Sequence, residues 1–315
     1  MRYMNKLSLA LVLFAFHSFP ARASTDPSES HAAAVLLNNF ETVFHTTPAM
    51  SSDLPADIRS GFTREPFGFL FAGLDAIGPQ VRSTLLDNSD AILVGSKDYH
   101  PPLGLGRVQS TRCYIAVLRK NSAFDFSRYF KTVAMKKAAG DARVWNWSAE
   151  LQEFGENDPR PSALFAVQIG QSYVLISNKL EELSLSEQLI SPGDDVKIFS
   201  ETRDWGDVRH HEFWGYRKYR HVRTPEKFDG TDRLTPHTQA LIVFVDVKER
   251  IGVLRLLSAS ESDNAPRNID ATKWIPPFKA VRSGVWESAF PLDGAGEFGD
   301  SGNSVLWLFG WGVVV

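Results

Sequence analysis

The chain has 315 residues, of which 43% are hydrophobic and 12% aromatic. This size and composition allow one large core or two modest ones, and they exclude a disordered or fibrous protein. The formal net charge of −3 excludes a general nucleic-acid binder, so we expect no nucleic-acid partner.

The first 23 residues predict a signal peptide. Arg2 and Lys6 precede the apolar run Leu7–Phe16, which is too short to span a bilayer, and small residues lead up to Ala23. We expect cleavage after Ala23 and a secreted or periplasmic product without a transmembrane span; the alternative is an uncut N-terminal anchor. Ser24 stands where a lipoprotein would need a cysteine, so the product should be released. Cleavage removes three basic residues and no acidic one, which takes the net charge from −3 to −6.

After the signal peptide, residues 24–53 are predicted to be a leader or docking arm with one helix over His31–Val43. A first α+β lobe is expected over residues 54–190. It begins with a helix over Gly68–Leu86, which Gly78 and the proline after it should divide. The predicted strands of this lobe are Asp90–Gly95, Arg112–Arg119, Val144–Phe154, Leu164–Ile169 and Tyr173–Ser177.

A second helix of this lobe is expected after Asp125, whose side chain can cap its N-terminus. Lys136 and Lys137 fall in the predicted last turn, where they would complement the helix dipole. Gly140 stands where such a helix would end.

The most regular pattern in the chain is a strand, a turn, a strand and a helix. Leu164–Ile169 and Tyr173–Ser177 should form a hairpin around the turn pair Gly170-Gln171. Asn178 and Glu181 then match the capping box of a following helix.

Residues 191–239 are predicted to be a linker, and residues 240–315 a second α+β lobe. This lobe should contain the strand Ala240–Val245, a helix capped by Asp246, and an apolar C-terminal element over Val305–Val315. The alternative for the last element is a removed anchor tail. The expected fold class is α+β, with mainly antiparallel sheets, packed helices and two related lobes that can also pack as one domain.

The strand-and-helix units at Thr111–Phe126, Phe165–Lys179 and Ala240–Gly252 resemble those of uncharacterised exported bacterial proteins of the α+β type. The resemblance rests on pattern rather than on a fixed motif. It implies a bacterial envelope location, and it brings no activity and no site residues.

The most distinctive stretch is Arg203–Arg223, which we call the basic-aromatic segment. It contains six Arg or Lys and three Asp or Glu residues, so it is positively charged within an acidic chain. Aromatic faces beside guanidinium groups suit an anionic polymer or a carbohydrate, and these are the expected partners. The alternative is an outer strand whose arginines pair with the acidic surface of the same protein. The predicted ligand-binding residues are Trp214, Arg217, Lys218, Arg220 and His221.

Four other groups of reactive residues favour structure over chemistry. The run at 210–212, His-His-Glu, lacks the spacing of a zinc site. The loop at 299–302 resembles the nucleophile loop of trypsin-like serine proteases but lacks the rest of that family's pattern. Strand alternation puts Glu150 and Glu153 on opposite faces, which disfavours a hydrolase pair. The only cysteine, Cys113, lies in an apolar run and is expected to be an inert buried thiol.

We therefore expect no catalytic residue, cofactor or metal site. The sequence favours an exported, non-catalytic binding or structural protein of the bacterial cell envelope that contacts an anionic or sugar ligand through the basic-aromatic segment. The alternative is an envelope hydrolase with a site between the lobes. Such a site would bring together at least two of Glu150, His210, His211, His221 and Ser301.

Overall fold

The computed structural model describes residues 27–48, 68–78, 80–99, 109–146, 163–191, 206, 208–218, 238–246, 248–258 and 277–291. The predicted signal peptide and the C-terminal run Val305–Val315 lie outside these residues. Within them, 47% of the residues lie in strands and 28% in helices. The prediction of mainly antiparallel sheet is therefore confirmed, with fewer helices than the sequence led us to expect.

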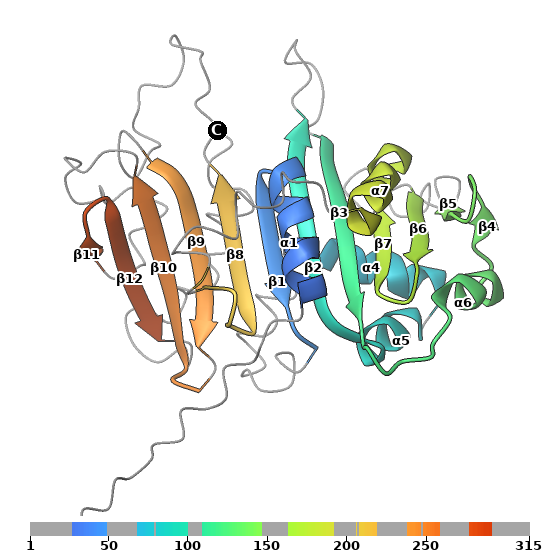
Figure 1. The fold of residues 1–315 in the computed structure, drawn as a ribbon, viewed down its shortest axis with the longest axis horizontal. Coiled ribbons are helices and arrows are strands. Elements are labelled where there is room, and N and C mark those ends of the chain that lie inside the picture. Colours follow the sequence, from blue (N-terminus) through green and yellow to red (C-terminus); the bar gives the residue numbers. More distant parts are fainter. Residues whose placement is uncertain are drawn as a thin grey trace, which may run out of the picture.

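The described strands form one twelve-stranded sheet in which every pair is antiparallel (Figure 1). The strands are β1 (Thr42–Thr46), β2 (Ser89–Tyr99), β3 (Gln109–Leu118), β4 (Lys136–Lys137), β5 (Arg143–Asn146), β6 (Ala163–Ile169), β7 (Tyr173–Ser177), β8 (Phe213–Lys218), β9 (Thr238–Asp246), β10 (Ile251–Ser258), β11 (Lys279–Arg282) and β12 (Val285–Pro291). Their order in the sheet is β11-β12-β10-β9-β8-β1-β2-β3-β7-β6-β5-β4. The helices are α1 (Pro27–Asn39), α4 (Gly68–Ile77), α5 (Val81–Asp87), α6 (Phe126–Thr132) and α7 (Leu185–Ile190), with a 3-10 helix at Leu180–Ser184.

Near the centre of the sheet β8 and β1 form an antiparallel pair, in which Trp214 stands opposite His45. β1 comes from the predicted arm, residues 24–53, and β8 from the predicted linker, residues 191–239. Both predictions need correction where the structure describes them, because Thr42–Thr46 and Phe213–Lys218 are inner strands of the sheet. β1 is short and covered on both faces, so it lacks the polar–apolar alternation by which a strand is recognised.

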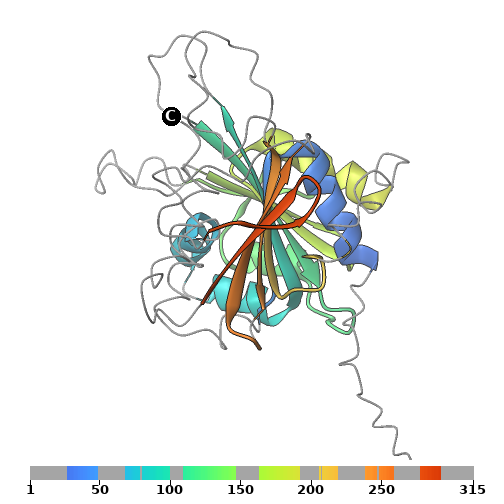
Figure 2. The same cartoon turned by 90° about the vertical axis from the view of Figure 1, so that its left-hand side faces the viewer.

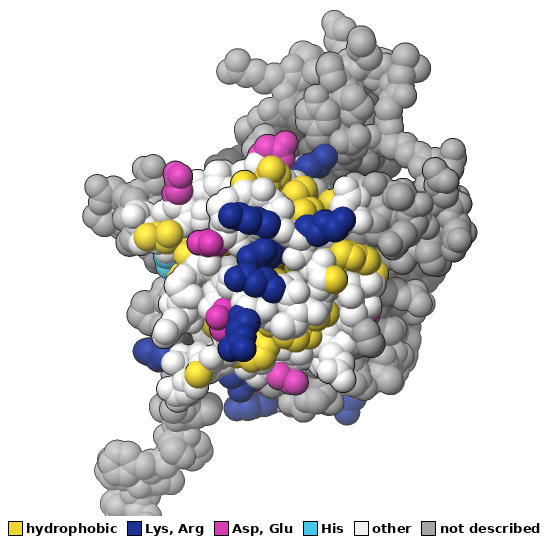
Figure 3. Space-filling view, turned by 90° about the vertical axis from the view of Figure 1, so that its right-hand side faces the viewer, with side chains coloured by type: hydrophobic (Ala, Val, Ile, Leu, Met, Phe, Trp, Pro, Cys, Tyr) yellow, Lys and Arg dark blue, Asp and Glu magenta, His cyan; other side chains and the backbone are white. Residues whose placement is uncertain are grey.

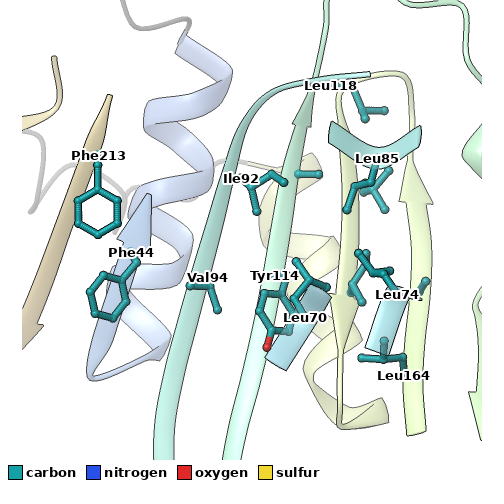
Figure 4. Close-up of a cluster of buried hydrophobic side chains, with 14 of the residues drawn as sticks. Phe44, Leu70, Leu74, Leu85, Ile92, Val94, Tyr114, Leu118, Leu164 and Phe213 are labelled. Atoms are coloured by element: carbon teal, nitrogen blue, oxygen red, sulfur yellow. The ribbon is translucent and has the colours of Figure 1, made fainter. Parts of the chain in front are cut away.

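Helices lie on both faces of the sheet over the strands from β1 to β6, because the inner strands bury side chains on both sides (Figure 2). On one face, α4, α5 and α6 pack over side chains such as Tyr114, and Figure 4 shows part of this cluster. On the other face, α1 and α7 pack over side chains such as Cys113 and Ile115. The α4–α5 break near Gly78 agrees with the predicted division of the helix over Gly68–Leu86.

The helix predicted after Asp246 is instead strand β10, which pairs with β9 and β12. Asp246 does accept a hydrogen bond from the backbone N–H of Glu249, at 3.0 Å, but this bond closes the β9–β10 turn. In that turn Arg250 adopts a left-handed φ of 56°. β10 buries Leu254 and Leu256 on one face and Arg255 on the other, so its apolar spacing matched a helical period by coincidence.

Helix α6 begins as predicted, with Asp125 accepting a hydrogen bond from the backbone N–H of Arg128 at 3.0 Å. The helix ends at Thr132 rather than near Gly140, because the chain reverses at Ala134, whose φ is 64°. Lys136 and Lys137 therefore form strand β4 and are not in a helix.

The predicted hairpin is confirmed as β6 and β7. Ile169 pairs with Tyr173, so the loop has three residues, and its first residue, Gly170, takes a φ of 57°. The prediction of a capping box after this hairpin is wrong. Asn178 accepts a hydrogen bond from the backbone N–H of Arg112 on β3, at 2.8 Å, and the next turn is a 3-10 helix without a side-chain cap.

Candidate functional site

Trp214 of the basic-aromatic segment is buried, with 1% of its surface exposed. Its ring stacks on that of His45, with centroids 5.3 Å apart and planes 6° apart. The expectation that Trp214 lines a binding surface is therefore wrong. β8 is an inner strand between β1 and β9, and the buried ring of Trp214 on it is not accessible to a ligand.

Among the described residues, the predicted ligand-binding side chains Trp214, Arg217 and Lys218 do not form one exposed surface. Arg217 and Lys218 are half-buried and, as neighbours on one strand, point to opposite faces of the sheet. The ammonium group of Lys218 donates a hydrogen bond to the backbone carbonyl of Leu37 in α1. Arg220 and His221 lie outside the described residues, so their role stays a prediction.

A buried polar pair fastens α1 to the centre of the sheet. Glu29 of α1 and His45 of β1 approach within 2.8 Å, Oε1 to Nε2, and His45 is only 2% exposed. The ring of Trp214 stacks on one face of the His45 imidazole. No sequence pattern indicates this pair, because both residues fall within the predicted arm, residues 24–53.

The contacts around His45 and Trp214 extend to β9, because Trp214 stands opposite Phe244 of that strand. His211 stacks on Phe244 with centroids 4.4 Å apart, and the guanidinium carbon of Arg255 lies 5.4 Å from the same ring. Arg255 also pairs with Glu287, Nε to Oε1, at 2.7 Å. These side chains contact one another rather than a ligand surface. Their contacts point to a structural role, in which they join the neighbouring strands and hold the segment before β8.

His211 has a lowered pKa, mainly because burial disfavours its charged form, while the nearby carboxylate of Asp246 opposes the shift. Burial also raises the pKa of the Cys113 thiol, and Glu182 adds to this effect. Cys113 is fully buried, which confirms the expectation of a buried thiol. Within the described part of the chain, no group of three or more His, Cys, Asp or Glu side chains could hold a metal ion.

The residues of the hydrolase hypothesis are only partly described. His210 and His211 belong to the turn before β8, where His211 contacts Phe244. Glu150, His221 and Ser301 lie outside the described residues, as does Glu153.

A different group of cations stands at the far end of the sheet. We call it the basic edge, and it comprises Arg128, Lys131, Lys136, Lys137 and Arg143. Residues 126–146 contain these five basic residues and one acidic residue, Asp141. Figure 3 shows Lys and Arg side chains gathered along the middle of the face at this end, where α6, β4 and β5 lie. Arg143 is half-buried and the other four cations are exposed.

None of the five cations of the basic edge forms an ion pair in the described part of the chain. Elsewhere in the fold, Lys97 and Arg255 each pair with a carboxylate at close range. At the basic edge the nearby carboxylate of Asp125 accepts a hydrogen bond from the backbone N–H of Arg128, and no ion pair with a cation side chain forms there among the described residues.

Two cations of the basic edge stand directly opposite each other. Lys137 of β4 is the cross-strand partner of Arg143 of β5, so both side chains leave the same face of the sheet. Like charges in this position destabilise a sheet by about 0.2–1 kcal/mol. The Nε of Arg143 is buried and has no hydrogen-bond partner among the described residues. The sequence pattern did not reveal this arrangement, because it placed the two lysines in a helix.

No protein-family model matches the chain, and no curated protein is a significant match. Among solved structures, crystal form III of TP0453 has a TM-score of 0.44 and 9% identity, and the match covers 90% of this chain and 99% of that chain. Crystal form I has a TM-score of 0.39 and 8% identity, with the same coverage. Crystal form IV has a TM-score of 0.39 and 6% identity, covering 82% of this chain and 92% of that chain. At these TM-scores the similarity says nothing about function. No helix in the described part of the chain combines the length and apolar character that a bilayer crossing requires.

Proposed function

We propose that this protein is an exported, non-catalytic binding protein of the bacterial cell envelope that holds an anionic partner at the basic edge. One observation carries the proposal: five cations that form no ion pair within the described residues gather at one end of an otherwise acidic chain. A local cationic surface attracts anions even when the net charge is negative, because the field near a surface depends on the nearest charges.

The arrangement of the cations supports binding over a purely structural role. Lysines on an edge strand also prevent sheets from joining edge to edge, and Lys136 and Lys137 would serve that purpose alone. Arg128 and Lys131 lie on α6 and Arg143 lies on the next strand inward, so edge protection does not account for them. An anionic partner would offset the repulsion between Lys137 and Arg143.

We also propose that the strands on either side of the β8–β1 pair are two related lobes, joined at that pair into one sheet. Export after cleavage at Ala23 is likewise proposed from the sequence alone.

Retention on a sulfate-bearing cation-exchange resin tests the proposed function. The variant Lys136→Glu with Lys137→Glu should elute at clearly lower salt than wild type. The control is Lys248→Glu with Lys279→Glu, which changes the net charge equally at two other exposed lysines that form no ion pair within the described residues. Equal elution of the two variants would contradict binding at the basic edge.

The basic-aromatic segment is the second candidate location, because it carries its own positive charge. The variant Arg217→Ala with Arg220→Ala separates the two locations on the same resin. If this variant loses retention and the Lys136/Lys137 variant keeps it, the anion binds at Arg203–Arg223 instead.

A further inference from the structure

We infer that the partner of the basic edge is a linear polyanion, a chain of regularly spaced phosphate, sulfate or carboxylate groups, rather than a small anion or a membrane surface. This inference rests on the proposed function. It adds the class of ligand, which follows from how the five cations are arranged and what surrounds them.

The cations diverge around the end of the sheet and do not enclose a common point. Lys136 and Lys137 are consecutive on β4, so their side chains leave opposite faces of the strand. Lys137 shares its face with Arg143, whose other cross-strand partner, Ala166, belongs to the cluster under α6. Arg128 and Lys131 are three residues apart on α6 and therefore lie on one side of that helix. The result is a curved cationic strip over α6, β5 and both sides of β4.

A strip of this kind binds a small anion weakly. An exposed cation attracts a single anion only weakly in water, because solvent and salt screen the interaction. A polymer whose charges repeat along its length can meet several cations of the strip at once. Each contact releases a condensed counterion from the polymer, so the contacts add up and the affinity depends steeply on salt.

The apolar residues of this unit disfavour a lipid bilayer as the partner. A protein that rests on a bilayer usually adds exposed apolar side chains to its cations. Among the described residues, the exposed large hydrophobic side chains are Leu180, Ile190, Ile251 and Val281, none of them within residues 126–146. Tyr129, Val133 and Trp145 of this unit pack against the core instead.

The test measures binding of the full mature chain to labelled probes at several salt concentrations. The phosphate probes are long-chain polyphosphate, pyrophosphate and inorganic phosphate, compared at equal phosphate concentration. Dextran sulfate and polygalacturonate represent sulfate and carboxylate chains, and vesicles of phosphatidylglycerol with phosphatidylcholine represent a membrane. The variants are Lys136→Gln with Lys137→Gln and the matched control Lys248→Gln with Lys279→Gln.

The expected result is binding to at least one linear polyanion, with the preferred polymer identifying the charged group. Each neutralised cation should contribute a factor of about five to the affinity at 0.1 M salt, from the single-strand slope of about 0.7 per contact. The Lys136/Lys137 variant should therefore bind about 25-fold more weakly and show a salt dependence shallower by about 1.4, whereas the control variant should match wild type.

Three outcomes would overturn the inference. Inorganic phosphate that competes as well as polyphosphate, per phosphate, would show a small-anion site and leave the proposed function intact. Binding to the vesicles without binding to any polymer would show a membrane partner, again with the proposed function intact. Unchanged binding of every probe by the Lys136/Lys137 variant would overturn the inference and the proposed function together.

Discussion

Strand β8 and residues 126–146, which carry the basic edge, are both rich in cations and aromatic residues, yet the two differ in exposure. β8 lies between two neighbouring strands, and its Trp214 is buried. β4 is the last strand of the sheet, and Lys136 and Lys137 are exposed. The comparison shows that composition alone does not identify a binding surface. The position of a strand in the sheet decides whether its side chains meet solvent or other side chains.

The largest expected difference between the two regions is the free energy of unfolding lost when a tryptophan of each is replaced by alanine. Trp214→Ala should lower the free energy of unfolding by about 3–5 kcal/mol, because it leaves a cavity beside His45 in the central strand pair. Trp145→Ala on β5 should cost about 1–2 kcal/mol, because Trp145 is only half-buried. Urea unfolding followed by circular dichroism measures both. Equal losses would show that the centre and the edge do not differ in packing.

Glycines of the two regions give a smaller contrast. A Cβ added at Gly215 on β8 would lie 2.7 Å from Phe44 and 2.8 Å from Val243, so Gly215→Ala should cost about 1–3 kcal/mol through overpacking. A Cβ at Gly140, in the β4–β5 turn, would meet nothing within 4 Å, and Gly140→Ala should cost about 1–2 kcal/mol from its left-handed φ of 55° alone.

Crystal structures of the two glycine variants would distinguish these causes. Gly215→Ala should displace the ring of Phe44, and Gly140→Ala should change only the turn. A Gly215→Ala variant with unmoved neighbours and wild-type stability would contradict the close packing at the sheet centre.

A weaker prediction concerns pH. The folded-state pKa of His211 is lowered, so the unfolded chain binds a proton more readily than the folded chain. Stability should therefore fall as the pH drops through about 6.5, and the effect should be small because His211 is only half-buried. His211→Phe keeps a ring on Phe244 and removes the titration. A variant with an unchanged pH dependence of unfolding between pH 7.5 and 5.5 (roughly one unit either side of the histidine value) would remove His211 as the cause.

The smallest expected effect is a gain in stability at the basic edge. Lys137→Gln removes the repulsion across the β4–β5 pair and should stabilise the protein by a few tenths of a kcal/mol, up to about 1 kcal/mol. The control Lys136→Gln stands opposite Val144 and should change stability by less than about 0.5 kcal/mol. Thermal unfolding at low salt measures both. A loss of stability in Lys137→Gln would show that the lysine has a structural role.

The sequence by itself determined the local features of this protein. It predicted the Asp125 cap, the β6–β7 hairpin with Gly170 in its turn, and the buried Cys113, because each depends on residues close together in the chain or on strong apolar character. It also placed most strands of the residue 54–190 region, where alternation or apolar runs were clear.

Only the tertiary structure decided which strands are inner and which are outer. The pairing of His45 with Trp214 and the place of β4 at the end of the sheet depend on contacts between segments far apart in the sequence. β1, β8 and β10 are covered on both faces, so their sequences carry no alternation that distinguishes a central strand from an arm, a linker or a helix. That arrangement decides whether a cation is exposed to solvent. Arg217, on an inner strand, is half-buried, whereas four of the five cations of the basic edge are exposed.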